Sequence, residues 1–158
     1  RLIESGVHFV TVRLRPAEFD FDTHTDNFSR LSNLLPPFDK GLASLIDRLK
    51  ERGLFSSTAI MVAGEFGRTP KVNNQGGRDH WARAMFALMA GGDVRGGQAI
   101  GETDKLAGEP NGSGYSPEDI AASFFQNIGI SPQKEFQTNV GRPINLVRDG
   151  QPIKQLFS

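Results

Sequence analysis

The feature that most constrains the fold is a short, nearly continuous apolar run at residues 58–63, Thr-Ala-Ile-Met-Val-Ala. A run of this length without polar alternation is typical of a strand that is buried on both faces, as in a parallel sheet. Residues 7–14 are rich in β-branched side chains and predict an earlier strand. Residues 84–90 fit either a helix or a strand, and their short length and the Gly91-Gly92 stop favour a strand.

Two segments carry helix signals. Apolar residues recur with a helical period from residue 38 to 49, after a proline pair, and a glycine at 53 supplies the stop. Residues 116–119, Ser-Pro-Glu-Asp, predict a helix start with serine as the N-cap and proline at the first helical position. Residues 94–110 are Gly-rich and irregular, and residues 141–158 predict a loop with a short terminal helix.

The order strand, helix, strand, strand, helix with short connections predicts an α/β fold, with a mostly parallel sheet flanked by helices. The length of 158 residues suits a single domain over residues 1–158. In such sheets ligands bind at the carboxyl ends of the strands. The residues that follow the predicted strands are therefore the first candidates for a site.

Composition excludes several classes of function. Lys plus Arg and Asp plus Glu number 18 each, so the chain has no net charge and no basic surface for nonspecific nucleic-acid binding. No apolar run approaches the roughly 20 residues that a membrane span needs. Cysteine is absent, which excludes disulfides, thiolate catalysis and Cys–zinc sites. Oligomeric state does not follow from the sequence.

The first polar cluster follows the strand predicted at residues 7–14 and occupies residues 20–27, Asp-Phe-Asp-Thr-His-Thr-Asp-Asn. Asp22 or Asp20 together with His24 could chelate a metal through a carboxylate oxygen and an imidazole nitrogen. The alternative is that these side chains only satisfy backbone groups of a loop.

The second polar cluster begins directly after residues 58–63. Glu65 is a candidate ligand at the strand end, and Asp79-His80 follow two glycines that free the backbone for an irregular path. Glu65 could equally be a loop acid paired with Arg68, and His80 a loop histidine against Trp81. Three such features beside predicted strand ends nevertheless favour a shared divalent-metal site.

Two arginines flank this second cluster. Arg68 and Arg78 could hold an anionic oxygen in a bidentate manner, or they could neutralise Glu65 and Asp79. Asn73 has turn chemistry and stays ambiguous. The remaining histidine, His8, lies within the first predicted strand, and we expect a core or sheet-surface histidine there rather than a ligand.

At these motifs the chain resembles the bacterial family called domain of unknown function 1501. The resemblance covers nearly all of the chain. The motifs that carry it are Phe21-Asp22-Thr23-His24, Asn27-Phe28, Gly64-Glu65-Phe66-Gly67-Arg68-Thr69-Pro70, Gly76-Gly77-Arg78-Asp79-His80-Trp81, Gly101-Glu102-Thr103-Asp104 and Ser116-Pro117-Glu118-Asp119. That family looks like a branch of the alkaline phosphatase and sulfatase superfamily, and its members are commonly exported to the periplasm.

The resemblance implies an alkaline phosphatase-like fold and metal-dependent hydrolysis of a small anionic phosphate or sulfate ester. The superfamily order of ligands is an Asp/His pair, then an Asp-His dipeptide, then a lone His. The resemblance implies the following roles: metal ligands Asp22, His24, Glu65 and His80; additional ligands or supporting residues Asp20, Asp79 and Asn73; catalytic residues Arg68 and Arg78. The ion would be zinc, manganese, magnesium or calcium. Two metals would stabilise the attacking and leaving oxygens.

Two departures qualify that implication. Glu65-Phe66 stands where the superfamily has Asp-His, and phenylalanine cannot bind a metal. No residue corresponds to the nucleophile that the superfamily carries on an early strand. We therefore expect the chain, which opens on Arg1, to be the C-terminal portion of a domain whose nucleophile lies upstream. The alternative function is a non-catalytic exported binding or structural protein that keeps a partial metal site.

Overall fold

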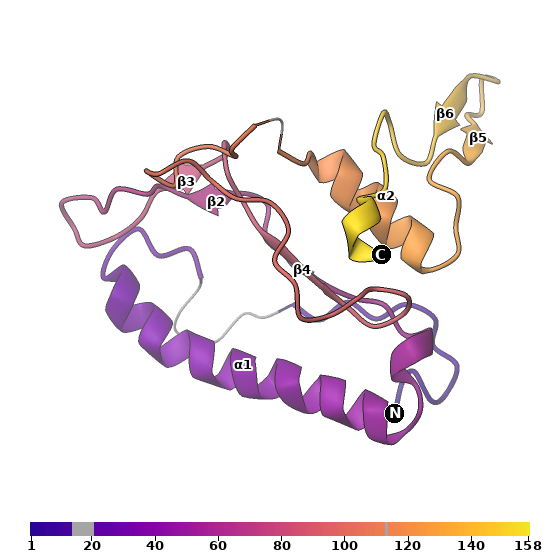
Figure 1. Ribbon diagram of the computed structural model, residues 1–158, viewed down its shortest axis with the longest axis horizontal. Coiled ribbons are helices and arrows are strands. Elements are labelled where there is room, and N and C mark those ends of the chain that lie inside the picture. The colour runs from indigo at the N-terminus through magenta and orange to yellow at the C-terminus, as the bar shows by residue number, and fades with distance from the viewer. Residues whose placement is uncertain (14–20, 113) are drawn as a thin grey trace.

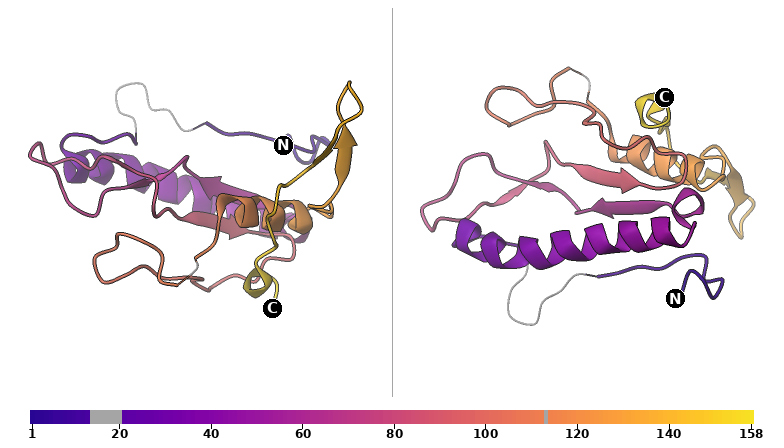
Figure 2. Two further views of the ribbon diagram at one scale, coloured as in Figure 1. Left: turned by 90° about the horizontal axis from the view of Figure 1, so that it is seen from above. Right: turned by 60° about the horizontal axis from the view of Figure 1, so that its bottom comes forward.

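A computed structural model describes residues 1–13, 21–112 and 114–158 (Figure 1). The elements are, in order, α1 (Asn27–Glu51), the 3-10 helix η1 (Phe55–Ser57), β1 (Ile60–Ala63), β2 (Gly67–Arg68), β3 (His80–Trp81), β4 (Ala87–Ala90), α2 (Pro117–Asn127), β5 (Glu135–Gln137), β6 (Pro143–Asn145) and the 3-10 helix η2 (Lys154–Leu156). In the right-hand view of Figure 2, α1 and α2 lie on opposite sides of the β1·β4 pair. The strand and helices expected from the middle of the chain are thus present.

The strands form three separate two-stranded sheets, β1·β4, β2·β3 and β5·β6, and each pair is antiparallel. The predicted α/β fold with a mostly parallel, alkaline phosphatase-like sheet is therefore wrong, since no parallel pair occurs among the described residues. The apolar run at 58–63 does form β1, but its side chains alternate between half-buried and exposed, and Met61 is 43% exposed. An all-apolar composition cannot distinguish a strand covered on both faces from one that is covered on one face only.

The strand predicted at residues 7–14 is also absent from the part of it that the structure describes. Residues 7–13 are exposed and pair with no other described segment, while residue 14 lies outside the described residues. High β-propensity in this segment reflects its side chains, but a strand also needs a neighbour for its backbone groups. The strand predicted at residues 84–90 is confirmed over Ala87–Ala90, as the neighbour of β1.

Helix α1 begins eleven residues before the helix start expected at residue 38 and runs through Pro36 and Pro37 (38 − 27 = 11). Proline inside a helix removes a backbone hydrogen bond and crowds the preceding turn, so the sequence alone favours a start after the pair. The tertiary structure instead fixes the start of the helix at its first turn. The backbone N–H of Asn27 donates to Gly76 O at 3.0 Å, and Asn27 is buried. The N-terminus of α1 is therefore held by the second polar segment of the chain.

Replacing Gly41 by alanine should stabilise the protein. Gly41 lies inside α1, and a Cβ added there would meet nothing within 4 Å. Alanine in an exposed helix interior is better than glycine by about 0.5–1 kcal/mol, because glycine loses more backbone entropy on folding. A urea titration should show this gain in the free energy of unfolding. The reverse change at a neighbouring exposed site, Ala43→Gly, should lower stability by a similar amount, and a neutral Gly41→Ala would contradict the prediction.

The predicted start of α2 is confirmed in detail. Ser116 accepts from the backbone N–H of Asp119 at 3.1 Å, and the Asp119 carboxylate accepts from the backbone N–H of Ser116 at 2.8 Å, which completes a capping box. The other oxygen of Asp119 accepts from the backbone N–H of Gln151 at 2.8 Å. These hydrogen bonds, that from Gln151 first, lower the pKa of the Asp119 carboxyl below its usual range. The same carboxylate thus caps α2 and fastens the C-terminal segment to it.

The fold leaves an unusually large area in contact with solvent. Its accessible surface is 11695 Å², whereas a compact monomer of 17.3 kDa exposes about 7,800 Å². Among the described residues, the buried apolar side chains are Leu34, Leu49, Ala122, Val147 and Ile153. Large apolar side chains such as Phe9, Phe86 and Val140 are mostly exposed. No helix within the described ranges is long and apolar enough to cross a membrane.

Candidate metal centre

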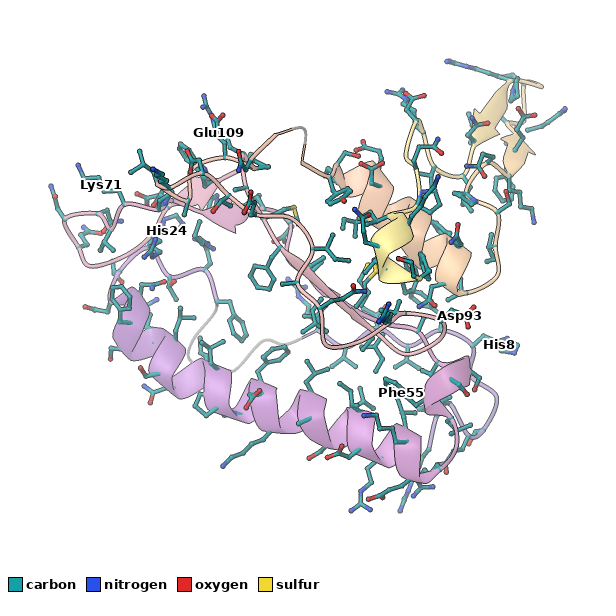
Figure 3. All side chains as sticks on the ribbon, in the orientation of Figure 1. His8, His24, Phe55, Lys71, Asp93 and Glu109 are labelled. Atoms are coloured by element: carbon teal, nitrogen blue, oxygen red, sulfur yellow. The ribbon has the colours of Figure 1, made fainter. Side chains whose placement is uncertain are left out.

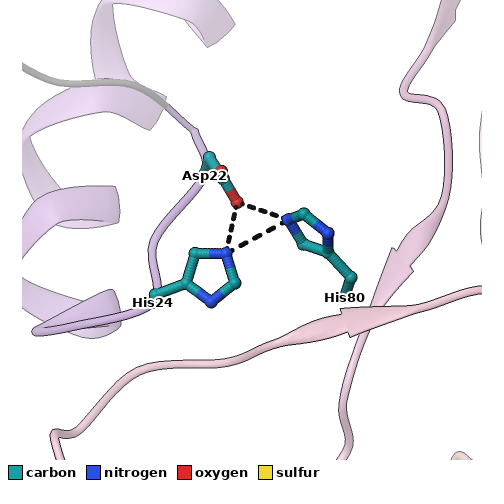
Figure 4. Close-up of side chains that lie close together, drawn as sticks. All are labelled: Asp22, His24 and His80. Carbon is teal, nitrogen blue, oxygen red and sulfur yellow. Dashed lines mark hydrogen bonds and ion pairs between the residues drawn. The ribbon is translucent and has the colours of Figure 1, made fainter.

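Three predicted ligands meet at one point of the structure (Figure 4). Asp22 Oδ1 lies 3.0 Å from His24 Nε2 and 2.9 Å from His80 Nε2, and the two Nε2 atoms are 3.1 Å apart. Asp22 and His24 come from the loop before α1, and His80 comes from β3. The side chains are 47%, 43% and 49% exposed, respectively, so the cluster is open to solvent. Of the predicted ligands, Asp22, His24 and His80 are therefore brought together.

The triangle of donor atoms has nearly the size that a metal ion requires. Zinc–nitrogen bonds of about 2.0–2.1 Å in a tetrahedron place neighbouring ligand atoms about 3.3–3.4 Å apart. The observed edges of 2.9 to 3.1 Å would need to widen by only a few tenths of an ångström. Three lone-pair atoms at this separation repel one another unless a positive charge lies between them, and either a proton or a metal ion supplies it. The triangle therefore has a size and a set of donor atoms that could hold a divalent ion.

The loops that carry the ligands are joined by backbone hydrogen bonds. Thr25 and Gly76 form an isolated antiparallel bridge. Asp26 N donates to Gln75 O at 3.1 Å, and Arg78 N donates to Thr23 O at 3.0 Å. In addition, β2 and β3 pair antiparallel and position His80 opposite Arg68. The convergence of the two polar clusters is thus produced by direct pairing of the loops, and not by the edge of a parallel sheet.

Asp22 carries a negative charge at neutral pH. The hydrogen bond with His80 and then that with the Arg68 guanidinium lower the pKa of Asp22 to about 2. A carboxylate without a proton can only accept hydrogen bonds, and it is the form that binds a metal. Because these side chains are half exposed, each ion pair contributes little to stability, and the backbone pairing holds the geometry instead.

Asp79 and Asn73 surround the far side of the His24 ring. Asp79 Oδ1 lies 2.8 Å from His24 Nδ1, the ring nitrogen that does not face Asp22 or His80. Asn73 Nδ2 donates to the two Asp79 oxygens at 3.2 and 3.3 Å and to His24 O at 3.0 Å. The contacts of His24, and next of Asn73, lower the pKa of the Asp79 carboxyl. Both residues thus contact His24 and lie outside the triangle.

The two arginines differ in their surroundings. Arg68 forms an ion pair with Asp22 and donates to Arg78 O at 3.2 Å, so its guanidinium adjoins the metal candidate. Arg78 donates to Thr69 O and Pro70 O, both at 2.7 Å, and its guanidinium lies 5.9 Å from the centre of the Phe28 ring. Arg78 thus contacts backbone carbonyls, and these contacts favour neither an anionic ligand nor the Asp79 carboxylate as its partner. A joint anion clamp by Arg68 and Arg78 stays a prediction.

The other predicted site residues lie outside the triangle. Glu65 is exposed just beyond β1 and is not a member of the cluster of metal-ligating atoms found among the described residues. Its neighbour Phe66 packs on His80 instead, with the ring centres 4.3 Å apart. Asp20 lies outside the described residues. His8 lies at the opposite end of the molecule from His24 (Figure 3), and it is exposed and in no strand, so the prediction of a core or sheet-surface histidine is wrong.

Comparison with known families identifies the chain. The family model described as Protein of unknown function (DUF1501) matches residues 1–157. The chain belongs to this family. No curated protein and no solved structure matches it. The predicted resemblance to DUF1501 is thereby confirmed, while the link from this family to alkaline phosphatases and sulfatases stays a prediction.

Several residues of this DUF1501 site were not predicted from the sequence. Thr23, which stands between Asp22 and His24 in the sequence, is 1% exposed. Its hydroxyl donates to the side chain of the buried Asn27. The Thr69 hydroxyl accepts from the backbone N–H of Asp79 at 3.1 Å. Phe66 cannot bind metal, yet its ring packs against the His80 ring, with the ring centres 4.3 Å apart. Their family motifs pointed to these positions, but their contacts involve distant segments and leave no local pattern.

Proposed function

We propose that this DUF1501 chain holds a divalent metal ion through Asp22, His24 and His80 and contributes it to the hydrolysis of a phosphate or sulfate ester. The observation that carries the proposal is the meeting of Asp22 Oδ1, His24 Nε2 and His80 Nε2 within 3.1 Å of one another, from loops more than 50 residues apart in sequence. The proposal rests on these side chains and on their order in the chain, and the fold adds no support to it.

The donor set narrows the choice of ion. Two imidazole nitrogens and one carboxylate suit zinc, manganese or iron(II), whereas magnesium and calcium prefer all-oxygen sites. Three protein ligands also leave at least one coordination position for water or substrate, as in catalytic zinc sites. When bound, such an ion would polarise the ester oxygen and favour the attack of a nucleophile.

The chain's own residues would orient the substrate and the ligands. Arg68 lies next to Asp22, 25% exposed, and its charge favours an anionic substrate at the open side of the cluster. Phe66 shields one face of His80 from water. The nucleophile would come from outside residues 1–158, because no predicted residue of this site has that role. Export to the periplasm, which the family resemblance implies, belongs to the same proposal.

A second function is favoured by one observation. Arg68 and Arg78 are both engaged within the chain, with Asp22 and with backbone carbonyls, which suits a site that binds or supports rather than reacts. In that case the protein would be a non-catalytic exported binding or structural protein that keeps the metal.

Metal analysis of the intact protein, followed by an assay with p-nitrophenyl phosphate and p-nitrophenyl sulfate, separates these functions. One equivalent of zinc, manganese or iron together with hydrolysis that chelation abolishes would support the hydrolase. One equivalent of metal without hydrolysis of either ester would support the binding protein. Protein that takes up no divalent ion, even after incubation with added zinc and manganese, would overturn both.

A further inference from the structure

Two further polar side chains, Asp79 and Asn73, contact His24 in a way that metal binding by His24 does not by itself require. Asp79 Oδ1 lies 2.8 Å from His24 Nδ1, while Nε2 of the same ring faces Asp22 and His80. The two nitrogens of an imidazole point to different sides of the ring, so Asp79 is on the side away from the ligand triangle. Its closest oxygen is therefore placed to orient His24 and not to bind the same ion.

We propose that Asp79 is a positioning residue that fixes His24 in the tautomer with the proton on Nδ1, so that the Nε2 lone pair is directed at the metal. The inference rests on the proposed metal site and assigns it a supporting shell. A carboxylate can only accept a hydrogen bond, so Nδ1 of His24, which makes the 2.8 Å hydrogen bond with Asp79, carries the proton. Nε2 lies 3.0 Å from Asp22 Oδ1, but that carboxylate accepts its hydrogen bond from His80 Nε2 at 2.9 Å, and the same His80 nitrogen can donate to His24 Nε2 at 3.1 Å. In a neutral imidazole the other nitrogen then has the lone pair that a metal needs.

Asn73 holds this carboxylate in place and couples both loops. Its Nδ2 group donates to Asp79 at 3.2 and 3.3 Å and to His24 O at 3.0 Å. Its Oδ1 atom accepts from the backbone N–H groups of Gln75 and Gly77, each at 2.9 Å. One amide thus fixes the path of the loop at residues 73–77, the Asp79 carboxylate and the backbone of His24 at once. Although the Asp79 side chain is 51% exposed, these hydrogen bonds hold it in one orientation.

The first test is the tautomer of His24 in the metal-free protein, measured by long-range ¹H–¹⁵N correlation at an alkaline pH where imidazole is neutral. We expect the Nδ1–H form in the wild type. In Asp79→Asn the new amide can turn its NH₂ group toward the ring, which favours the Nε2–H form and points the lone pair away from the metal. A wild-type spectrum with predominantly the Nε2–H form would overturn the assignment, and this measurement does not depend on the folding of any variant.

The second test is the zinc affinity of the same proteins, by calorimetric titration with zinc alone. Loss of a side chain that orients a ligand typically weakens metal binding by about 10- to 100-fold, and we expect a loss in that range for Asp79→Asn. Asp47→Asn is the matched control, because it makes the same charge change at an exposed position of α1. Affinity of Asp79→Asn within about threefold of the wild type would contradict the proposal. Should the wild type bind no zinc, the proposed metal site fails, and the tautomer measurement still decides the role of Asp79.

Discussion

Replacing His80 by alanine is expected to lower the affinity for zinc by about 100-fold or more. Even residues that only orient a ligand contribute about 10- to 100-fold, so the loss of a ligand should reach at least the upper end of that range. His80 Nε2 supplies one corner of the triangle with Asp22 and His24, and without it two protein ligands remain. The dissociation constant, measured by competition with a chromogenic chelator, gives the effect directly.

The control for this prediction is His8→Ala, which removes the same type of side chain at the opposite end of the molecule (Figure 3). It should leave zinc affinity unchanged. Because His80 is 49% exposed, its removal should lower stability without metal only slightly. Equal zinc affinities for His80→Ala and His8→Ala would show that the triangle holds no metal.

Replacing Gly77 by alanine should separate the two loops and destroy the site. An added Cβ would lie 1.8 Å from His24 O, 2.0 Å from the His24 carbonyl carbon and 2.5 Å from Thr25 N. These are backbone atoms that cannot rotate away, and Gly77 is itself buried. Overpacking of this kind destabilises a fold by about 1–3 kcal/mol. We expect the denaturation midpoint to fall and zinc binding to be lost together.

Gly96→Ala provides the comparison for this second prediction. A Cβ at Gly96 would meet nothing within 4 Å, and its backbone is not in the left-handed region. The substitution should therefore leave zinc binding unchanged and should not lower the midpoint. If Gly77→Ala matched Gly96→Ala in both measurements, the close approach of residues 76–77 to the His24 backbone would be wrong.

Some local elements of the fold were predicted from the sequence, namely the start of α2 and the strand β1, whereas the pairing of the strands was not. The capping box at Ser116 and Asp119 is encoded within four neighbouring residues, and the structure contains it. The β1 strand was likewise predicted from its own composition. However, a partner strand is chosen by contacts with residues far along the chain. The antiparallel pairing of Ile60 with Ala90 could not be predicted from the apolar run, which had favoured a parallel sheet.

The predicted start of α1 was wrong for a related reason. Propensity places a boundary at Pro36-Pro37, since proline breaks the helical hydrogen-bond ladder. The helix nevertheless begins at Asn27, where Gly76 O accepts the first backbone N–H and the side chain is buried with Thr23. The contact that fixes this helix start comes from a segment 49 residues away (76 − 27 = 49) and has no local signature in the sequence.

At the candidate site, the candidate side chains and the family could be predicted from the sequence. Asp22, His24 and His80 could be selected because carboxylates and imidazoles are the metal-binding groups of a chain without cysteine. Which of the candidates meet depends on the tertiary structure. It brings His80 to His24 but leaves Glu65 outside the cluster, and it turns Asp79 toward His24 Nδ1. The physical reason is that side-chain chemistry is a property of single residues, whereas convergence depends on backbone hydrogen bonds between loops at residues 23–27 and 75–78.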